Sequence, residues 1–285
     1  MPNKNSLNDK VITNFSNIKF WYLIVPLAVL FLFFCFFVLV NHNNHNIEYY
    51  IGIQKNLFIY LNKYLSYFNA LETNLTQLGD VLIAFPLITI FIIYAPRLWE
   101  AIITSSLISL GISALLKKLF EVPRPAAVID NDCFVIIGKA ICGKTSMPSG
   151  HSIMSFVVIT VLLFAFMPQK NKKKLIWSLL ITLAGILIAS SRIGVGAHYP
   201  LDVVIGSMIG FCIAVIGIEI TNKVSWLRTI GNKKYYPIHI VLLIIWIAVI
   251  IFKILEDNLA IDYISIIALL VTLSIILGSY VKKNQ

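Results

Sequence analysis

The chain has 285 residues, of which 59% are hydrophobic, and its mean hydropathy is +0.87. One soluble core could not hide this much apolar surface, so the composition excludes a soluble globular enzyme and indicates an integral membrane protein. The formal net charge of +10 is explained below by membrane topology, and a nucleic-acid partner is not needed to account for it.

Apolar runs of membrane length recur along the chain. Each holds roughly 20 residues, enough to cross a hydrocarbon core of about 30 Å. None alternates as the strands of an outer-membrane barrel do, so we expect an all-α, polytopic helical bundle. The expected spans are 20–40, 78–95, 98–117, 151–168, 175–195, 202–221, 237–254 and 262–281.

Three segments follow from these spans. Residues 1–19 form a basic tail, residues 20–221 hold the first six spans, and residues 222–285 add two more. The first span resembles a secretory signal, but it ends at Asn41 without a small-residue cleavage site, so we expect it to remain as an anchor.

Orientation follows from the distribution of lysine and arginine. Basic residues gather in loops on the cytoplasmic side of membrane proteins. A cytoplasmic amino terminus places most of the 23 basic residues there. Eight crossings then return the carboxyl terminus to the same side. This topology fits a bacterial inner membrane, with contact to anionic lipids at the inner leaflet. The residues on that side are Lys4, Lys10, Lys19, Arg97, Lys170, Lys172, Lys173, Lys174, Lys223, Arg228, Lys233, Lys234, Lys282 and Lys283.

Residues 50–68 carry apolar side chains at helical spacing. They fit an amphipathic helix in the outer headgroup region, and equally a helix packed on the bundle without touching lipid. The apolar positions are Tyr50, Ile53, Leu57, Leu61, Tyr64, Leu65 and Phe68.

Several histidines and cysteines need no catalytic role. His42 and His45 lack acidic or thiol partners for a metal site, and His239 is typical of a polar residue at a membrane interface. Cys133 and Cys142 lie in the predicted outer loop, where an oxidising compartment allows a disulfide between them, although two free thiols fit the sequence as well. Cys35 and Cys212 lie within spans and are expected to pack as small apolar residues.

Three polar clusters lie at the outer ends of the spans, where ionisable groups are costly and usually functional. In the first, Lys117 closes a span, and prolines at 123 and 125 should end the helix near Phe120 and hold Arg124 in a stiff turn. A non-functional interpretation is that Lys117 only extends its ammonium to the membrane interface, as lysines at helix ends do. This interpretation does not explain why Arg124 is held between two prolines.

The second cluster, Pro148-Ser149-Gly150-His151, stands where a span should begin. The start of a helix offers unpaired N–H groups and partial positive charge, which suits an anion. An ordinary serine cap beside a chance histidine is the alternative. In the third cluster, Arg192 closes a span, and His198 and Asp202 are four residues apart at the start of the next. A carboxylate beside an imidazole fixes its tautomer and leaves the other nitrogen free to attack.

Together the clusters resemble the tripartite signature of the type 2 phosphatidic acid phosphatase family, which reads Lys-x6-Arg-Pro, Pro-Ser-Gly-His and Ser-Arg-x5-His-x3-Asp. Every fixed position is present between residues 117 and 202, within a six-helix core. The matching residues are Lys117, Arg124, Pro125, Pro148, Ser149, Gly150, His151, Ser191, Arg192, His198 and Asp202.

The resemblance implies a metal-independent lipid phosphatase without a cofactor. His198 would be the nucleophile that forms a phosphohistidine, oriented by Asp202, and His151 would be the general acid and base. The phosphate would be bound by the three cations and by the amides and hydroxyl of the second cluster. These phosphate-binding residues are Lys117, Arg124, Ser149, Gly150 and Arg192.

The substrates of the family are lipid A, undecaprenyl diphosphate, phosphatidylglycerol phosphate and phosphatidic acid. The Arg-Pro-Ala-Ala stretch and compact outer loop look somewhat like the bacterial lipid A 1-phosphatases, whereas spans 237–254 and 262–281 exceed the minimal pattern. A phosphotransferase would use the same phosphohistidine, and only its product would distinguish it. A soluble vanadate haloperoxidase is excluded by the spans. A transporter would place its ionisable residues near the membrane midplane rather than at helix ends.

Overall fold

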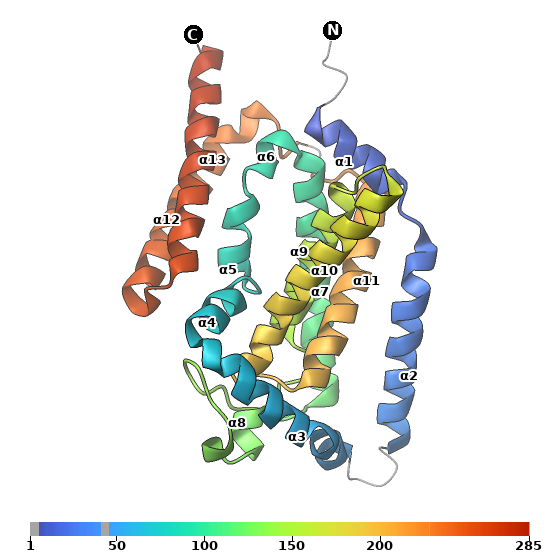
Figure 1. Ribbon diagram of the computed structural model, residues 1–285. Coiled ribbons are helices and arrows are strands. Elements are labelled where there is room, and N and C mark those ends of the chain that lie inside the picture. The colour runs from blue at the N-terminus through green and yellow to red at the C-terminus, as the bar shows by residue number, and fades with distance from the viewer. Residues whose placement is uncertain (1–5, 41–45, 228, 285) are drawn as a thin grey trace.

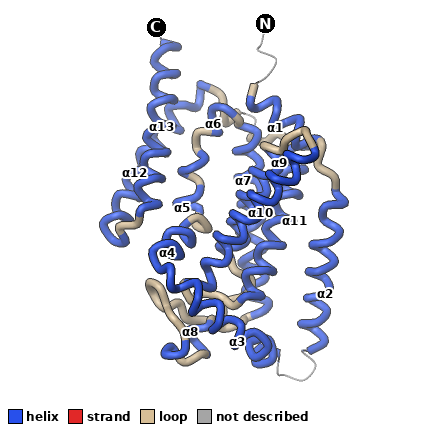
Figure 2. Tube along the Cα trace, viewed as in Figure 1, coloured by secondary structure: helices blue, strands red, loops and turns tan. Residues whose placement is uncertain are grey.

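The computed structural model describes residues 6–40, 46–227 and 229–284, and every regular element in them is a helix (Figure 1, Figure 2). The predicted all-α fold is confirmed. Short helices are α1 (Leu7–Ser16), η1 (Phe20–Leu23), η3 (Ser66–Phe68), α4 (Asn69–Gln77), α5 (Val81–Ala84), η4 (Pro86–Ile88), α6 (Phe91–Tyr94), α8 (Pro125–Val128), η5 (Asn131–Cys133) and η6 (Lys233–Tyr235). Longer helices are α2 (Ile24–Val40), α3 (Asn46–Leu65), α7 (Pro96–Phe120), α9 (Gly150–Ala165), α10 (Asn171–Gly194), α11 (Pro200–Lys223), α12 (Tyr236–Asp257) and α13 (Ala260–Asn284).

The chain is a multi-pass membrane protein. Six segments of the described residues are long and apolar enough to cross a bilayer, and α9 is a shorter apolar helix beside them. Both ends of the chain point to one end of the bundle, and α3, α4 and α8 lie at the other end, which we call the distal end (Figure 1). This arrangement follows from an even number of passes.

The expected continuous span 78–95 is wrong. Residues 81–94 form three short pieces, α5, η4 and α6, that run from the distal end toward the termini (Figure 1). Pro86 lacks an N–H and prevents a regular helix here. Asp80 caps α5 by accepting from the N–H of Leu82, and the Thr89 hydroxyl donates to the carbonyl of Pro86. The proline and the local caps therefore break this segment into short helices, although its apolar composition favours one continuous span.

The C-terminal hairpin α12–α13 packs against this broken segment. Trp246 Nε1 donates to the carbonyl of Leu82 at 2.9 Å, and Ser265 Oγ donates to the carbonyl of Ile83 at 3.2 Å. The hydroxyls of Thr89 and Thr272 lie 2.9 Å apart. Irregular backbone at membrane depth is tolerated only where protein or water satisfies its polar groups. The two additional helices supply such partners for the broken segment.

Helix α3 turns a different face to the bundle from the one that its apolar pattern indicates. Tyr50, Gln54, Phe58 and Asn62, spaced four apart, are buried. Much of the predicted apolar stripe, including Ile53, Leu57, Tyr64 and Phe68, is exposed instead. Packing of α3 on the bundle is therefore observed, and insertion of the exposed apolar face into the outer headgroup region remains a prediction.

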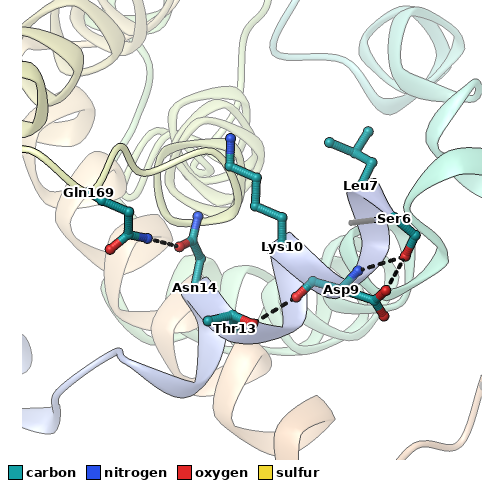
Figure 3. Close-up of a pocket in the computed structure, with 7 residues that line it drawn as sticks. All are labelled: Ser6, Leu7, Asp9, Lys10, Thr13, Asn14 and Gln169. Carbon is teal, nitrogen blue, oxygen red and sulfur yellow. Dashed lines mark hydrogen bonds between the residues drawn. The ribbon is translucent and has the colours of Figure 1, made fainter. Parts of the chain in front are cut away.

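The predicted tail 1–19 contains α1, which closes the bundle at the end where the termini lie. Asn14 Nδ2 donates to the carbonyls of Ala165 and Met167, and Gln169 donates to Asn14 Oδ1. Figure 3 shows the polar pocket that α1 forms with Gln169. This pocket lies at the opposite end of the bundle from the three sequence clusters (Figure 1).

Candidate active site

The first cluster forms a fixed turn at the distal end. Helix α7 ends at Phe120, as predicted, because Glu121 adopts a left-handed conformation with φ of 47° and the prolines follow. Arg124 is extended, and its N–H donates to the carbonyl of Gly143 at 2.9 Å. Its side chain is only 8% exposed. The guanidinium is therefore held in the protein rather than in solvent.

The second cluster starts α9. Ser149 is the N-cap, and its Oγ accepts from the N–H of Ser152 at 3.3 Å. The Ser149 N–H donates to the carbonyl of Asp202 at 3.1 Å. The hydroxyl and the N–H of Ser149 are thus both bonded within the protein. Gly150 is the first residue of α9, and the N–H groups of a first helical turn have no partners within the helix.

Lys117 and His151 flank this helix start. A Cβ placed on Gly150 would lie 3.3 Å from Lys117 Nζ, so the ammonium lies against the first turn of α9. On the other side, a Cβ on Gly79 would lie 2.8 Å from the Cβ of His151, so only glycine fits there. Lys117 lies against Gly150, the Ser149 N–H reaches the third cluster at Asp202, and Arg124 lies beside His198, so the three clusters meet in one site.

The third cluster is a turn that folds back on Arg192. The N–H groups of Ala197 and His198 donate to the Arg192 carbonyl at 3.0 and 3.2 Å. Gly196 enables the turn with φ of 78° and lies directly against the carbonyl of Val135, where a side chain would clash. Helix α11 begins at Pro200, so Asp202 lies in its first turn.

His198 is almost fully buried, with 1% of its surface exposed. Arg124 Nη1 lies 3.3 Å from His198 Nε2. A guanidinium can only donate, so Nε2 must accept and the ring proton must lie on Nδ1. His198 Nδ1 is 3.6 Å from Asp202 Oδ2, which is longer than a hydrogen bond. The geometry thus presents an unprotonated Nε2 toward the cations.

Asp202 is fully buried and receives donors on both oxygens. Tyr50 Oη donates to Oδ1 at 2.6 Å, Ser146 Oγ donates to Oδ2 at 2.5 Å, and the Tyr199 N–H donates to Oδ2 at 3.0 Å. These donors occupy both oxygens and hold the carboxylate in one orientation. The sequence analysis did not identify Tyr50 and Ser146 as site residues, since neither belongs to the signature.

Helix α3 and α4 supply further residues that sequence reasoning missed. Asn62 Nδ2 donates to the carbonyls of Ile193 and Gly194 and to that of Val135, at 2.9 to 3.1 Å. This single amide joins α3, the outer loop and the end of α10. Arg192 Nη1 donates to the hydroxyl of Thr76 on α4. Gln54, Asn62 and Thr76 are polar residues that are buried in the structure. In the sequence they stand among apolar and polar residues on their helices, and nothing there distinguishes them from exposed polar residues.

The electrostatic environment keeps the nucleophile candidate neutral. Burial lowers the pKa of His198 from 6.5 to about 4; Asp202 opposes this shift, whereas Arg192 and Arg124 add to it. A neutral imidazole retains the lone pair that a nucleophile needs. Arg192, only 6% exposed, keeps its Nε without a partner among the described residues. The site is therefore cationic and has donor capacity left for an anion.

The remaining sequence candidates lie outside this site. Cys133 and Cys142 are exposed, free thiols, so the disulfide is not formed in this structure. His239 contacts Tyr236 near the start of α12, and His42 and His45 lie outside the described residues.

The chain is similar to known proteins over the region that holds the three clusters. Residues 97–226 match the family model described as PAP2 superfamily. An undecaprenyl-diphosphatase from Sulfolobus acidocaldarius is 26% identical over 208 residues, which are 72% of this chain and 93% of that relative. The crystal structure of Aquifex aeolicus LpxE is similar over 59% of this chain and 95% of that chain, with 27% identity and a TM-score of 0.48.

The family match spans the whole tripartite signature, from Lys117 to Asp202, and the structure gathers those residues at one end of a membrane bundle. The chain is a membrane phosphatase, and its residues 97–226 are similar to the PAP2 superfamily, the family of the type 2 phosphatidic acid phosphatases.

Proposed function

We propose that this phosphatase hydrolyses a phosphate ester or diphosphate on a membrane lipid, through a phosphohistidine intermediate, at the periplasmic face of a bacterial inner membrane. The observation that carries the proposal is the placement of His198 Nε2. This atom accepts from Arg124 on one side, and Asp202 lies beside the opposite ring nitrogen. A buried imidazole in this orientation is suited to attack an electrophile that the same arginine binds.

Binding of the phosphate requires cations and donors around the phosphoryl oxygens. Lys117, Arg124 and Arg192 provide positive charge, and the first turn of α9 adds N–H groups at Gly150. Charge on these oxygens shifts during phosphoryl transfer, so donors fixed in advance stabilise the transition state without reorganising.

The chemical steps then need only two imidazoles. Nε2 of His198 forms a bond to phosphorus as the bond to the lipid oxygen breaks, and His151 gives that oxygen a proton. Water next attacks phosphorus while His151 accepts its proton, the N–P bond breaks, and phosphate leaves. Asp202 supports the positive charge that His198 carries in the intermediate.

The substrate is an amphiphile that reaches the site from the bilayer, because the site lies at the end of the spans, at headgroup depth. The name of the Sulfolobus relative places a polyprenyl diphosphate among the candidates. Phosphatidic acid, phosphatidylglycerol phosphate and lipid A complete the panel to be compared.

The proposal is tested by phosphate release in detergent with EDTA present. We expect His198→Ala to lose activity by at least 1,000-fold and His151→Ala by roughly 100-fold or more, since general acid–base catalysis contributes about 10²–10⁴-fold. His239→Ala, near the opposite end of the bundle, should retain activity. Equal activity in all three variants would refute the assigned roles. Recovery of the phosphate on a second lipid instead of free in solution would identify a phosphotransferase.

The orientation is tested with the native thiols. Cys133 and Cys142 are exposed and lie in the loop that follows α8. After mild reduction, a membrane-impermeant maleimide should label them in cells with a permeabilised outer membrane and an intact inner membrane. A cysteine introduced as Lys173→Cys, in a Cys133→Ser/Cys142→Ser background, should be labelled only after the inner membrane is lysed. The reverse pattern would place the active site on the cytoplasmic side.

A further inference from the structure

A second cavity lies beside the catalytic residues. It has a volume of about 380 Å³, within the range of small-molecule sites. Its walls come from α4, the outer loop 136–141, the turn 195–197 and the turn between α12 and α13. Arg192 is the one residue of the signature in its lining, and His151 and His198 do not line it. We call this cavity the α4 pocket.

Arg192 makes the α4 pocket a binding site rather than a surface hollow. This side chain is more than nine-tenths buried, and its Nε has no hydrogen-bond partner among the described residues. Its Nη1 is held by Thr76, which also lines the pocket. A phosphate bound by Arg192 would therefore lie at the inner end of the pocket, with the groups attached to it in reach of the walls.

The polar lining suits hydroxyl groups. Gln77 is half-buried, and no hydrogen bond of its amide is recorded in the described ranges. Glu256 is exposed at the rim and, within the same ranges, forms no recorded ion pair. An amide both donates and accepts, and a carboxylate accepts from hydroxyls. Apolar side chains such as Ile137 and Leu259 complete the walls.

The C-terminal hairpin holds its wall in place. The N–H of Ile261 donates to Asn74 Oδ1 on α4 at 2.9 Å. Lys253 Nζ lies 3.2 Å from Asp257 Oδ2 and 3.4 Å from Asp262 Oδ2, which links the two sides of the turn. The pocket is thus built before a ligand arrives, and such preorganisation reduces the cost of binding.

We propose that the α4 pocket binds a hydroxylated headgroup, a sugar or a glycerol, that carries the phosphate to be removed, and that the α12–α13 turn selects for it. The inference rests on the proposed function and extends it by naming the substrate class. Lipid A 1-phosphate and phosphatidylglycerol phosphate carry hydroxyls near the phosphate, whereas phosphatidic acid and undecaprenyl diphosphate carry none.

Turnover provides the first test. The wild-type enzyme should show a higher kcat/KM for the two hydroxylated lipids than for the other two, and whichever is preferred distinguishes a sugar from a glycerol. Gln77→Leu and Glu256→Ala should each lower kcat/KM for the preferred lipid by roughly 3–10-fold, the worth of one hydrogen bond. They should leave phosphatidic acid within twofold. Asp132→Ala, an exposed acid at the same end outside the pocket, is the matched control. Equal losses on all lipids, or no loss, would refute the proposal.

Binding provides a second test that needs no turnover. The His198→Ala protein is titrated with glucosamine 1-phosphate, glycerol 3-phosphate and ethyl phosphate, which lacks a hydroxyl. At least one hydroxylated phosphate should bind roughly tenfold more tightly than ethyl phosphate, and Gln77→Leu should abolish the difference. Equal binding of all three would overturn the inference whether or not the wild type releases phosphate. Absence of lipid phosphatase activity with selective binding would refute the proposed function alone.

Discussion

Tyr50 donates a 2.6 Å hydrogen bond to Oδ1 of Asp202, across 152 residues of sequence. The bond is fully buried and joins α3 to the residue that orients the proposed nucleophile. It extends the candidate site beyond the residues of the family signature. The role of Tyr50 is to position Asp202, since its hydroxyl contacts the carboxylate and not His198.

Tyr50→Phe should therefore lower kcat by roughly 10- to 150-fold and leave KM nearly unchanged, because a hydrogen bond to a buried charge is worth about 1.5–3 kcal/mol. Steady-state kinetics with the preferred lipid checks this. Tyr49→Phe, on the exposed side of the same helix, is the control and should behave as wild type. A change in KM alone would show that Tyr50 acts on binding instead.

The sequence predicted what local chemistry determines. The end of α7 near Phe120 was expected from the prolines at 123 and 125, and a helix start at the Pro148–His151 cluster was expected from its position before an apolar run. Residues of the signature were predicted because their types and spacing are fixed by the reaction.

Long-range partners could not be predicted in this way. The buried face of α3 depends on partners that lie far along the chain. Tyr50 donates to Asp202, and Asn62 donates to the carbonyl of Ile193. Gln54 accepts from the N–H of Leu201. The apolar pattern alone fits two positions for the face with Ile53 and Leu57, against the bundle or in the outer headgroup region. The break in 81–94 is stabilised by donors on α12 and α13, and no local rule indicates those.

The tautomer and protonation state of His198 form a second prediction. Its pKa of about 4, lowered chiefly by burial, means that the ring is neutral above this value and protonated below it. Nitrogen NMR of ring-labelled protein should show a midpoint near pH 4, with the proton on Nδ1 and Nε2 unprotonated. The signal is assigned by its absence in His198→Ala. A midpoint near 6.5, or an Nε2–H tautomer, would contradict the proposed nucleophile geometry.

The hairpin gives a third prediction. Ser265→Ala leaves the carbonyl of Ile83 without its donor, and a buried polar group without a partner costs about 1–3 kcal/mol. The midpoint of thermal unfolding in detergent should fall by several degrees. Ser274→Ala is the matched control, because the Ser274 hydroxyl bonds to Leu270 on the exposed side of its own helix. Equal midpoints for the two variants would show that the hairpin does not stabilise the broken segment.

Glu72 gives a prediction of pH-dependent stability. Its side chain lies against Gly194, is 4% exposed, and has no hydrogen-bond partner for Oε2 among the described residues. Burial raises the pKa of Glu72 from 4.5 to about 7. Below pH 4.5 the folded and unfolded forms are both protonated, and the carboxyl does not affect stability.

Between pH 4.5 and about 7, the carboxyl of Glu72 loses its proton in the unfolded chain but keeps it in the folded protein. The folded protein therefore loses stability as the pH rises to about 7. Glu72→Gln removes this dependence. Its thermal midpoint should match that of the wild type near pH 4.5 and exceed it by several degrees at pH 8.5, whereas Glu121→Gln, at an exposed position, should follow the wild type at both values. A Glu72→Gln protein that is less stable than wild type at pH 8.5 would show that Glu72 is ionised and paired in the fold.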